Sequence, residues 1–268
     1  MSPTDDKAKQ RSGSIQSVER AMALLEVLGE DEEGYRLTDL ATRTGLPPST
    51  VHRMLTTLEK RRFVQFDQSD GMWHVGRAVF TIGSAFVRQR NFVAPALPYL
   101  RRLRDLTRET ANLGVVDDGE VVVLSQIESR EIMRAITRVG GRVPMAASGM
   151  GKAILATYSE ADVDAIVSAS PARRAAPHPL SRAELDRQLA AARTNGYALD
   201  DEDFVPGLRC VAAVVYNAQA EALCAISVSG LAQRLTGERI ANIGRLLNDT
   251  ARDLTHALGG RMPGQNAP

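Results

Sequence analysis

The chain has 268 residues, of which 44% are hydrophobic and 24% charged, so its length suits two domains and its composition is that of a globular protein. No apolar run is long enough to span a membrane and the polar N-terminus lacks a secretion signal, so we expect the protein in the cytoplasm. The net charge of +1 gives no reason by itself to expect nucleic-acid binding. Cys210 and Cys224 are expected to be free thiols, and four scattered histidines lack metal-ligand spacing.

Three helices are predicted in the first sixty residues. The segment SIQSVERAMALLEVLGE carries apolar residues at helical spacing, with Ser14 or Ser17 available as a cap. A second helix is expected to begin at a Thr38 cap and to end at Gly45, which can take the left-handed conformation. The Pro-Pro pair that follows suits the first turn of a third helix. Two helices joined by a tight glycine turn indicate a helix-turn-helix.

The third helix separates an apolar stripe from a polar one. Val51, Leu55 and Leu58 form the apolar stripe, and hydroxyl and basic residues form the other. Such side chains can reach base edges and phosphates in a DNA major groove, although the same pattern also fits the solvated face of a surface helix. The candidate DNA-binding residues of this motif are Thr38, Pro48, Ser49, Thr50, His52, Arg53, Thr56 and Lys60.

A hairpin follows the third helix. The segment FVQFDQSDGMWHVG has two short alternating runs around Asp70-Gly71, which completes a winged helix-turn-helix over residues 14–76, behind a disordered tail of residues 1–13. This domain is not basic overall. However, five of its seven Lys and Arg residues lie between Arg43 and Arg62, where Glu59 is the only acid, so one face can still bind phosphates.

A linker helix is predicted over residues 77–92. Its apolar residues fall in helical register and suit a dimer seam. From Arg77 to Arg104 there are six arginines and no acid, which suits either DNA-backbone contact or simple solubility. Pro95 and Pro98 are expected to break the helical stretch before a longer helix opens a second domain, residues 93–260, which a disordered tail of residues 261–268 follows.

The second domain mixes hairpins and helices. LGVVDDGEVVVLSQI predicts two strands around Asp117-Asp118-Gly119, and CVAAVVYNAQAEALCAISVSG predicts another hairpin. Helical patterns occur in GKAILATYSEADVDAIV, in SRAELDRQLAAARTNG, where Ser181 and Glu184 form a capping box, and in the last helix, LTGERIANIGRLLNDTARDLTHAL. The absence of regular strand-helix alternation indicates an α+β domain with an antiparallel sheet.

The segment ASGMGKA resembles half of a phosphate-binding loop but fails both tests for one. Ala146 stands where the first glycine is needed, and Ala153 follows Lys152 in place of Ser or Thr. What remains is a helix N-terminus at Gly149, Met150 and Gly151 whose N–H groups favour a small anion, or glycines that only permit a sharp turn.

The sequence resembles the isocitrate lyase regulator (IclR) family of bacterial transcription factors from about Ile15 to about Gly259. The motifs that carry the likeness are SVERAMALLEVL, LTDLATRTGLPPSTVHRMLTTLEKRRFV, VPMAASGMGKAILA, GYALDDEDFVPGLRCVAAVV and AISVSG. The resemblance implies a winged helix-turn-helix, a linker helix and a GAF- or PAS-like effector domain. It also implies a homodimer or homotetramer that binds double-stranded operator DNA, without a metal or cofactor.

The members that respond to glyoxylate and pyruvate are the ones this chain resembles most. By that resemblance, N–H groups of Gly149 and Met150 would bind an effector carboxylate. A polar lining would come from Ser148, Asp200, Cys210, Ser227 and Ser229, and an apolar wall from Ile132, Ala135, Val143 and Leu208. Compared with those members, Ala135 stands in place of a larger residue and Met150 in place of a smaller one. The sequence therefore does not determine the volume of the pocket.

We therefore expect a transcriptional repressor controlled by a small organic acid, with a larger ligand such as an aromatic acid as the alternative. A hydrolase with Ser148 or Cys210 as nucleophile is disfavoured, because no histidine lies next to either and only His178 remains as a distant base. The sequence does not identify the effector or the operator. It also does not show whether the protein represses or activates transcription, or whether it forms a dimer or a tetramer.

Overall fold

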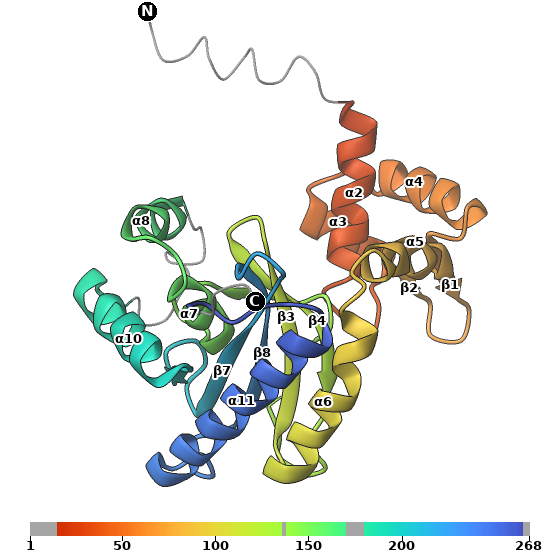
Figure 1. Cartoon of the computed structure of the whole chain (residues 1–268). Coiled ribbons are helices and arrows are strands. Elements are labelled where there is room, and N and C mark those ends of the chain that lie inside the picture. Colours follow the sequence, from red (N-terminus) through yellow and green to blue (C-terminus); the bar gives the residue numbers. More distant parts are fainter. Residues whose placement is uncertain (1–14, 136–137, 170–179, 265–268) are drawn as a thin grey trace, which may run out of the picture. The chain divides into compact units, whose positions relative to one another are not determined.

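A computed structural model describes residues 15–135, 138–169 and 180–264. The chain divides into two compact units, Met1–Gln89 and Arg90–Pro268, and each is described by itself (Figure 1). Ser14, His178 and most of the two predicted tails lie outside the described residues. Within the described part, no helix is both long and apolar enough to cross a membrane.

The first unit is a winged helix-turn-helix, as predicted. Its core is a cluster of buried side chains from all three N-terminal helices and the hairpin, including Leu24, Leu40, Leu55 and Trp73. The elements in chain order are α2 (Gln16–Leu28), α3 (Leu37–Thr44), α4 (Pro48–Lys60), β1 (Val64–Asp67), β2 (Met72–Val75) and α5 (Arg77–Arg88). The antiparallel β1–β2 pair forms the wing.

The turn residues of this unit act as predicted, but two helix caps do not. Gly45 ends α3 with φ 65°, and α4 begins at the second proline of the Pro-Pro pair. Thr38 does not cap α3, because the helix already begins at Leu37. Tyr35 exchanges two backbone hydrogen bonds with Trp73, which holds the chain extended up to that point. Ser17 likewise lies inside α2, whose N-cap is Ile15.

The second unit is built on one six-stranded sheet in the order β5-β4-β3-β8-β7-β6, in which all neighbours are antiparallel. Its strands are β3 (Thr110–Asp117), β4 (Glu120–Ile127), β5 (Arg142–Pro144), β6 (Ala198–Asp201), β7 (Leu208–Tyr216) and β8 (Ala222–Leu231). Its helices are α6 (Val93–Thr107), α7 (Gly149–Leu155), α8 (Glu160–Ala169), α10 (Arg182–Asn195) and α11 (Gly237–Ala257). The predicted α+β class and antiparallel sheet are confirmed.

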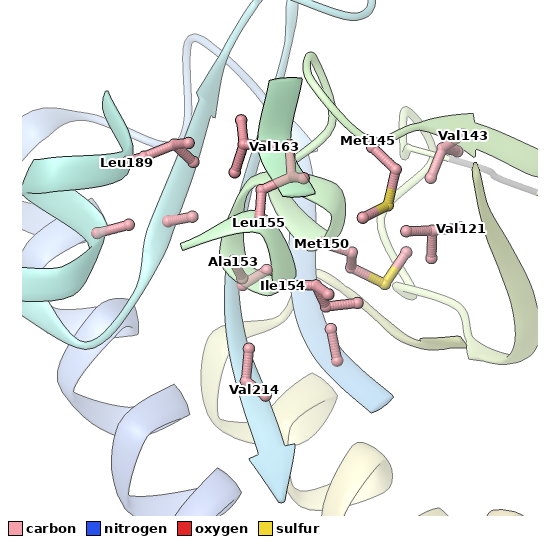
Figure 2. Close-up of a cluster of buried hydrophobic side chains, with 14 of the residues drawn as sticks. Val121, Val143, Met145, Met150, Ala153, Ile154, Leu155, Val163, Leu189 and Val214 are labelled. Carbon is pink, nitrogen blue, oxygen red and sulfur yellow. The ribbon is translucent and has the colours of Figure 1, made fainter. Parts of the chain in front are cut away.

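Both faces of this sheet are covered. Helices α6 and α11 lie side by side across one face (Figure 1). On the other face, α7 packs into a cluster that includes Val121, Ile154, Val163 and Val214, as Figure 2 shows. Five consecutive residues of strand β7 are buried and the other four are half-buried, as expected for a strand with helices on both sides. The short α7 is therefore held at the centre of a packed layer.

Local signals place most elements of this unit correctly. Asp118 and Gly119 both take positive φ, 51° and 74°, which a tight hairpin turn between β3 and β4 requires. The Ser181 hydroxyl accepts a hydrogen bond from the Glu184 N–H, so the predicted cap of α10 is present.

The predicted break at the prolines before α6 is wrong. The helix begins earlier, at Val93, and Pro95 falls in its first turn, where a missing N–H costs nothing. Pro98 lies inside the helix, which continues to Thr107. Burial of Val93, Ala96 and Leu100 outweighs the helix-breaking tendency of this proline.

Candidate DNA-binding surface and effector cavity

Helix α4 presents its predicted polar stripe to solvent. Val51 and Leu55 are fully buried, which turns the opposite side of the helix outward. The predicted contacts that are exposed are Thr38, Pro48, Ser49, His52, Arg53 and Lys60, and those that are half-buried are Thr50 and Thr56. The arrangement lets side chains on α4 reach a duplex without disturbing the core of the unit.

Two details restrict how this surface can act. The Thr56 hydroxyl donates to the His52 carbonyl at 2.9 Å, so in this conformation it can only accept a hydrogen bond from DNA. Arg43, counted among the basic residues of the predicted DNA face, pairs with Glu30 and lies 5.2 Å from the centre of the Tyr35 ring. The positive character of the unit therefore depends more on arginines that lack such partners.

The second unit contains a cavity of about 380 Å³ beside α7. It brings together most of the predicted effector residues: Ala135, Val143, Ser148, Met150, Asp200, Leu208, Cys210 and Ser229. Gly149 and Ser227 are buried but do not line the cavity surface, and Ile132 does not line it either, its side chain being 96% exposed. Eight residues separated by up to ninety-four positions in the chain thus meet at one site.

The register of the sheet explains how the polar residues meet. Asp200 on β6 lies opposite Cys210 on β7, and Cys210 lies opposite Ser229 on β8, so the three form one row across three strands. Asn112 on β3 extends this polar patch, because its amide nitrogen donates to the hydroxyls of Ser227 and Ser229, each at 3.2 Å. The row gives the cavity one polar side, and the rest of the lining combines apolar side chains with Arg138, Arg142 and Arg209.

Asp200 is held in a fixed orientation. Its Oδ1 accepts hydrogen bonds from the backbone N–H groups of Asp203 at 2.9 Å and Phe204 at 3.2 Å. Burial raises the pKa of Asp200 to about 6, although the Lys152 ammonium and the two N–H donors act in the opposite direction. The carboxyl group therefore changes its protonation around pH 6.

Ser148 acts mainly as the cap of α7. Its hydroxyl donates to the Pro144 carbonyl at 2.7 Å and accepts from the Gly151 N–H at 3.1 Å, so this N–H is not available to an anion. The N–H groups of Gly149 and Met150 have no acceptor within the helix, as usual for a first turn. A side chain at Gly149 would stand 2.8 Å from the Cys210 carbonyl oxygen, so the glycine permits α7 to approach β7.

Met150 does not close the cavity. Its sulfur lies 3.0 Å from the position that a Cβ atom would take at Gly114 on β3. The thioether therefore occupies space that this glycine leaves empty, and part of the Met150 side chain packs beside Met145 and Val121 (Figure 2).

The lysine of ASGMGKA has a structural role. Lys152 is only 1% exposed, and its Nζ lies 2.7 Å from Asp203 Oδ2 and donates to Gln188 Oε1 at 2.8 Å. These contacts connect α7 to α10 and to the loop after β6. The acidic loop, which the sequence alone leaves open as a solvated surface, is instead tied to the protein interior at Asp200 and Asp203.

The geometry gives no support to a nucleophile here. Burial raises the pKa of Cys210 to about 11 and that of Cys224 to about 12, so both thiols are protonated at neutral pH. No histidine is found among the described residues that line the cavity, so neither Cys210 nor Ser148 has an imidazole base there.

Several lining residues were missed by sequence reasoning. They are Asn112, Arg138, Gly141, Arg142, Phe204, Val205 and Arg209. Asn112 could have been found as the polar residue in the apolar strand that follows Thr110. The arginines carry no local signal. Arg142 pairs with Asp117 at 2.7 Å, and Arg209 pairs with Asp201.

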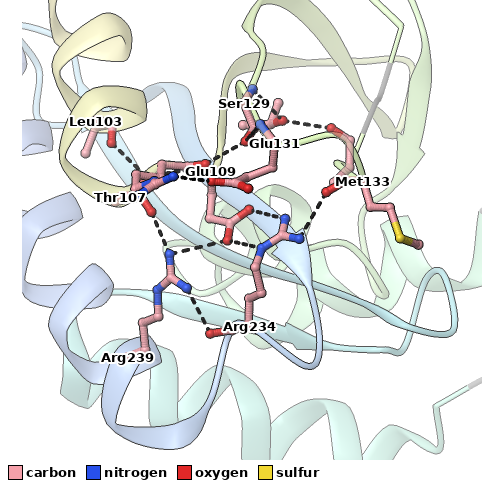
Figure 3. A network of polar contacts seen from close by, with 11 residues as sticks. Leu103, Thr107, Glu109, Ser129, Glu131, Met133, Arg234 and Arg239 are labelled. Carbon is pink, nitrogen blue, oxygen red and sulfur yellow. Dashed lines mark hydrogen bonds and ion pairs between the residues drawn. The ribbon is translucent and has the colours of Figure 1, made fainter.

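A buried ion network, shown in Figure 3, fixes the chain that leads into the cavity wall. Arg234 makes two 2.7 Å hydrogen bonds to the carboxylate of Glu109, which is fully buried, and Arg239 lies 3.3 Å from the same carboxylate. Arg234 also donates to the Met133 carbonyl at 3.0 Å. The Thr110 hydroxyl donates to the Ala135 carbonyl at 2.8 Å, so the buried Thr110 and the half-buried Arg234 position this segment.

Two family models match the chain. The IclR helix-turn-helix domain matches residues 17–68, and the bacterial transcriptional regulator IclR C-terminal domain matches residues 84–256. Curated relatives include the acetate operon repressor of Salmonella typhimurium and the transcriptional repressor IclR of Escherichia coli. Each is 38% identical to this chain over 93% of its length and 92% of the relative's.

Solved structures agree on the fold. The Thermotoga maritima IclR matches with a TM-score of 0.76 at 23% identity over 92% of this chain and all of that one. An IclR homolog from Microbacterium hydrocarbonoxydans, complexed with 4-hydroxybenzoate, matches with a TM-score of 0.73 at 25% identity over 90% and 99% of the two chains. The family consists of regulators, which confirms the expectation that the protein is not an enzyme. The chain belongs to the IclR family of DNA-binding bacterial transcriptional regulators.

Proposed function

We propose that this regulator is a repressor whose second unit binds a small organic acid and thereby changes the affinity of the first unit for operator DNA. The observation that carries the proposal is the 380 Å³ cavity with one polar side, in a chain that also presents the exposed polar stripe of α4. Control of this kind needs an effector that binds the two DNA-affinity states differently, typically by about 1–3 kcal/mol.

The effector we propose first is a carboxylate such as glyoxylate or pyruvate. Its carboxylate would accept from the N–H groups of Gly149 and Met150, and its oxo or hydroxyl group would meet Asp200 and Ser229. Ser227 would support this side through Asn112, which hydrogen-bonds both serines. A protonated Asp200 accommodates an anion better than a charged one, which makes such binding stronger at mildly acidic pH.

A larger acid is the second candidate, and the cavity volume favours it. Pockets of about 300 Å³ and above suit ligands well beyond three carbons. Met150 leaves this volume open, and Val143, Phe204 and Leu208 provide an apolar wall. The relative solved with 4-hydroxybenzoate has the same fold. An aromatic or long-chain acid would fill the cavity more completely than pyruvate would.

We also propose that the protein acts as a dimer or tetramer in the cytoplasm, where bacterial operators are found. Support comes from α5, on which Phe80 is 79%, Ile82 60% and Phe86 38% exposed. Three large apolar side chains on one exposed helix favour burial against a second copy. In this proposal residues 77–92 link an operator-binding domain, residues 14–76, to the effector domain, residues 93–260.

The experiment that tests the function combines gel retardation and thermal unfolding. The protein should retard a fragment of its own promoter region at low salt, and one acid from a panel of two-carbon to aromatic acids should raise its melting temperature and alter retardation. Asp200→Ala or Ser229→Ala should reduce the effector response and leave retardation intact. Absence of retardation with and without every acid would refute the proposal.

A further inference from the structure

A groove of about 770 Å³ lies between α2 and α4 in the first unit, apart from the effector cavity. Helix α2 contributes Ser17, Arg20 and Ala21. Helix α4 contributes Thr50, His52, Arg53, Met54, Thr56, Thr57 and Leu58. None of these lining residues is an acid, although acids and bases are almost equally frequent in the whole chain. The function proposed above gives no role to the α2 side of this groove.

The two arginines of the groove have no side-chain partner in the described part of the chain. Neither Arg20 nor Arg53 forms an ion pair or side-chain hydrogen bond with any residue in ranges 15–135, 138–169 and 180–264. Arg43, on the neighbouring helix α3, is by contrast neutralised by Glu30. Two unpaired cations that line one acid-free groove repel each other and together attract an anion.

The hydroxyls of the groove fall into two kinds. Thr56 and Thr57 donate to the carbonyls of His52 and Arg53, at 2.9 and 2.8 Å, so their protons are already used. Ser17 and Thr50 have no such bond to any residue that the structure describes and can donate to an anion. The free donors thus come from both helices, and the exposed side chains of Ser17 and Arg53 leave the groove open to solvent. An extended polyanion suits this geometry better than an enclosed small molecule.

We propose that the groove holds a segment of DNA backbone, with Arg20 and Ser17 of α2 binding phosphates on one side and Arg53 of α4 on the other. The proposal rests on operator binding by α4 and adds α2 as a second positioning element. It also assigns Arg53 to the backbone, so that base recognition is left to residues on the outer edge of α4, such as Ser49 and Lys60. Backbone contacts fix the register of a protein on DNA but carry no sequence information.

The test is the salt dependence of binding to two duplexes, a fragment of the protein's own promoter region and a mixed-sequence duplex. Each lost phosphate contact should reduce the slope of log K against log salt by about 0.9. Arg20→Ala and Arg53→Ala should each show this reduction and should weaken binding to both duplexes by the same factor. Arg20→Lys, which keeps the charge, should retain the slope of the parent protein.

Arg187→Ala is the matched control, because it removes one exposed arginine from α10 of the other unit and should leave the slope unchanged. An unchanged slope for Arg20→Ala, with the parent protein still binding, overturns the inference and leaves the proposed function standing. A loss confined to the promoter fragment would instead make the arginine a base reader and also overturn it. If Arg20→Ala changes the sedimentation coefficient but not the slope, the groove is an interface between copies and the inference is wrong.

Discussion

The side chains proposed to contact DNA differ from those proposed to contact the effector in whether they form ion pairs or hydrogen bonds within the protein. Arg53 and Arg20 are without ion-pair partners in the described part of the chain, whereas Asp200 and Ser229 are hydrogen-bonded within their own unit. A surface for a polyanion exchanges protein–water contacts for phosphate contacts, while a cavity needs its polar groups fixed before a ligand arrives. Substitutions on the first surface should therefore change binding alone, and those around the cavity should also change stability.

Glu109→Ala is the substitution for which we expect the largest loss of stability. Removal of the buried carboxylate leaves Arg234 and Arg239 without their common partner, which should lower the free energy of unfolding by about 3 kcal/mol. Urea unfolding of the full chain measures the loss. Asp249→Ala is the control, because it breaks an exposed pair with Arg252 and should cost about 1 kcal/mol or less. Equal effects of the two variants would contradict the role assigned to the network.

A pH titration of Asp200→Asn sharpens the comparison. The raised pKa of Asp200 means that the folded protein loses stability as the pH rises from 3.8 through about 6. Asparagine keeps the oxygen that accepts from Asp203 and Phe204 and removes the charge. The variant should therefore be more stable than the parent at about pH 8, by up to about 3 kcal/mol, and equally stable near pH 3.5 or below.

Urea unfolding of both proteins across this pH range measures the difference between them. A difference that does not depend on pH, or one that favours the parent at high pH, would show that burial does not raise the pKa of this carboxyl group.

Gly151→Ala tests how tightly α7 is held beside the cavity. The new Cβ would stand 2.3 Å from the Met145 carbonyl oxygen, so the helix must move, at a cost of about 1–3 kcal/mol. Gly83→Ala on α5 is the matched control, since nothing lies within 4 Å of its Cβ and alanine favours a helix by up to about 1 kcal/mol. Thermal unfolding should separate the two variants in opposite directions, and a stabilised Gly151→Ala would contradict the close packing.

The smallest effect is expected for Ile132→Ser. The side chain is 96% exposed, so stability should change by no more than about 0.5 kcal/mol although the residue belongs to the effector unit. Thermal unfolding without effector measures this change, and a larger loss would mean that the side chain is buried in solution. A reduced response to the effector at unchanged stability would place Ile132 against the bound ligand, as the family resemblance implies.

Much of the fold follows from local signals in the sequence. Gly45 and the Asp118-Gly119 pair mark turns because their positive φ values follow from residue type. The cap at Thr38 could not be predicted correctly, because a bridge between Tyr35 and Trp73 decides where the helix begins. The continuity of α6 through Pro98 likewise depends on burial against the sheet, which outweighs local preference.

The candidate sites were predictable only where motif and geometry coincide. The row of Asp200, Cys210 and Ser229 came from resemblance, and the sheet register brings these residues together. Asn112 and the pair of Glu109 with Arg234 were missed, because each acts through partners distant in sequence. Glu109 and Arg234 are 125 positions apart, and no local pattern connects them.

The pairing of β3 with β8 has a consequence for synthesis of the protein. Ala111 on β3 lies opposite Val228 on β8, so the centre of the sheet cannot close until more than a hundred further residues have left the ribosome. The first unit depends on much shorter-range contacts and can fold while the rest of the chain is still being made. Until β8 arrives, the apolar strands that precede it are exposed, and this interval is when the nascent regulator is most vulnerable to aggregation.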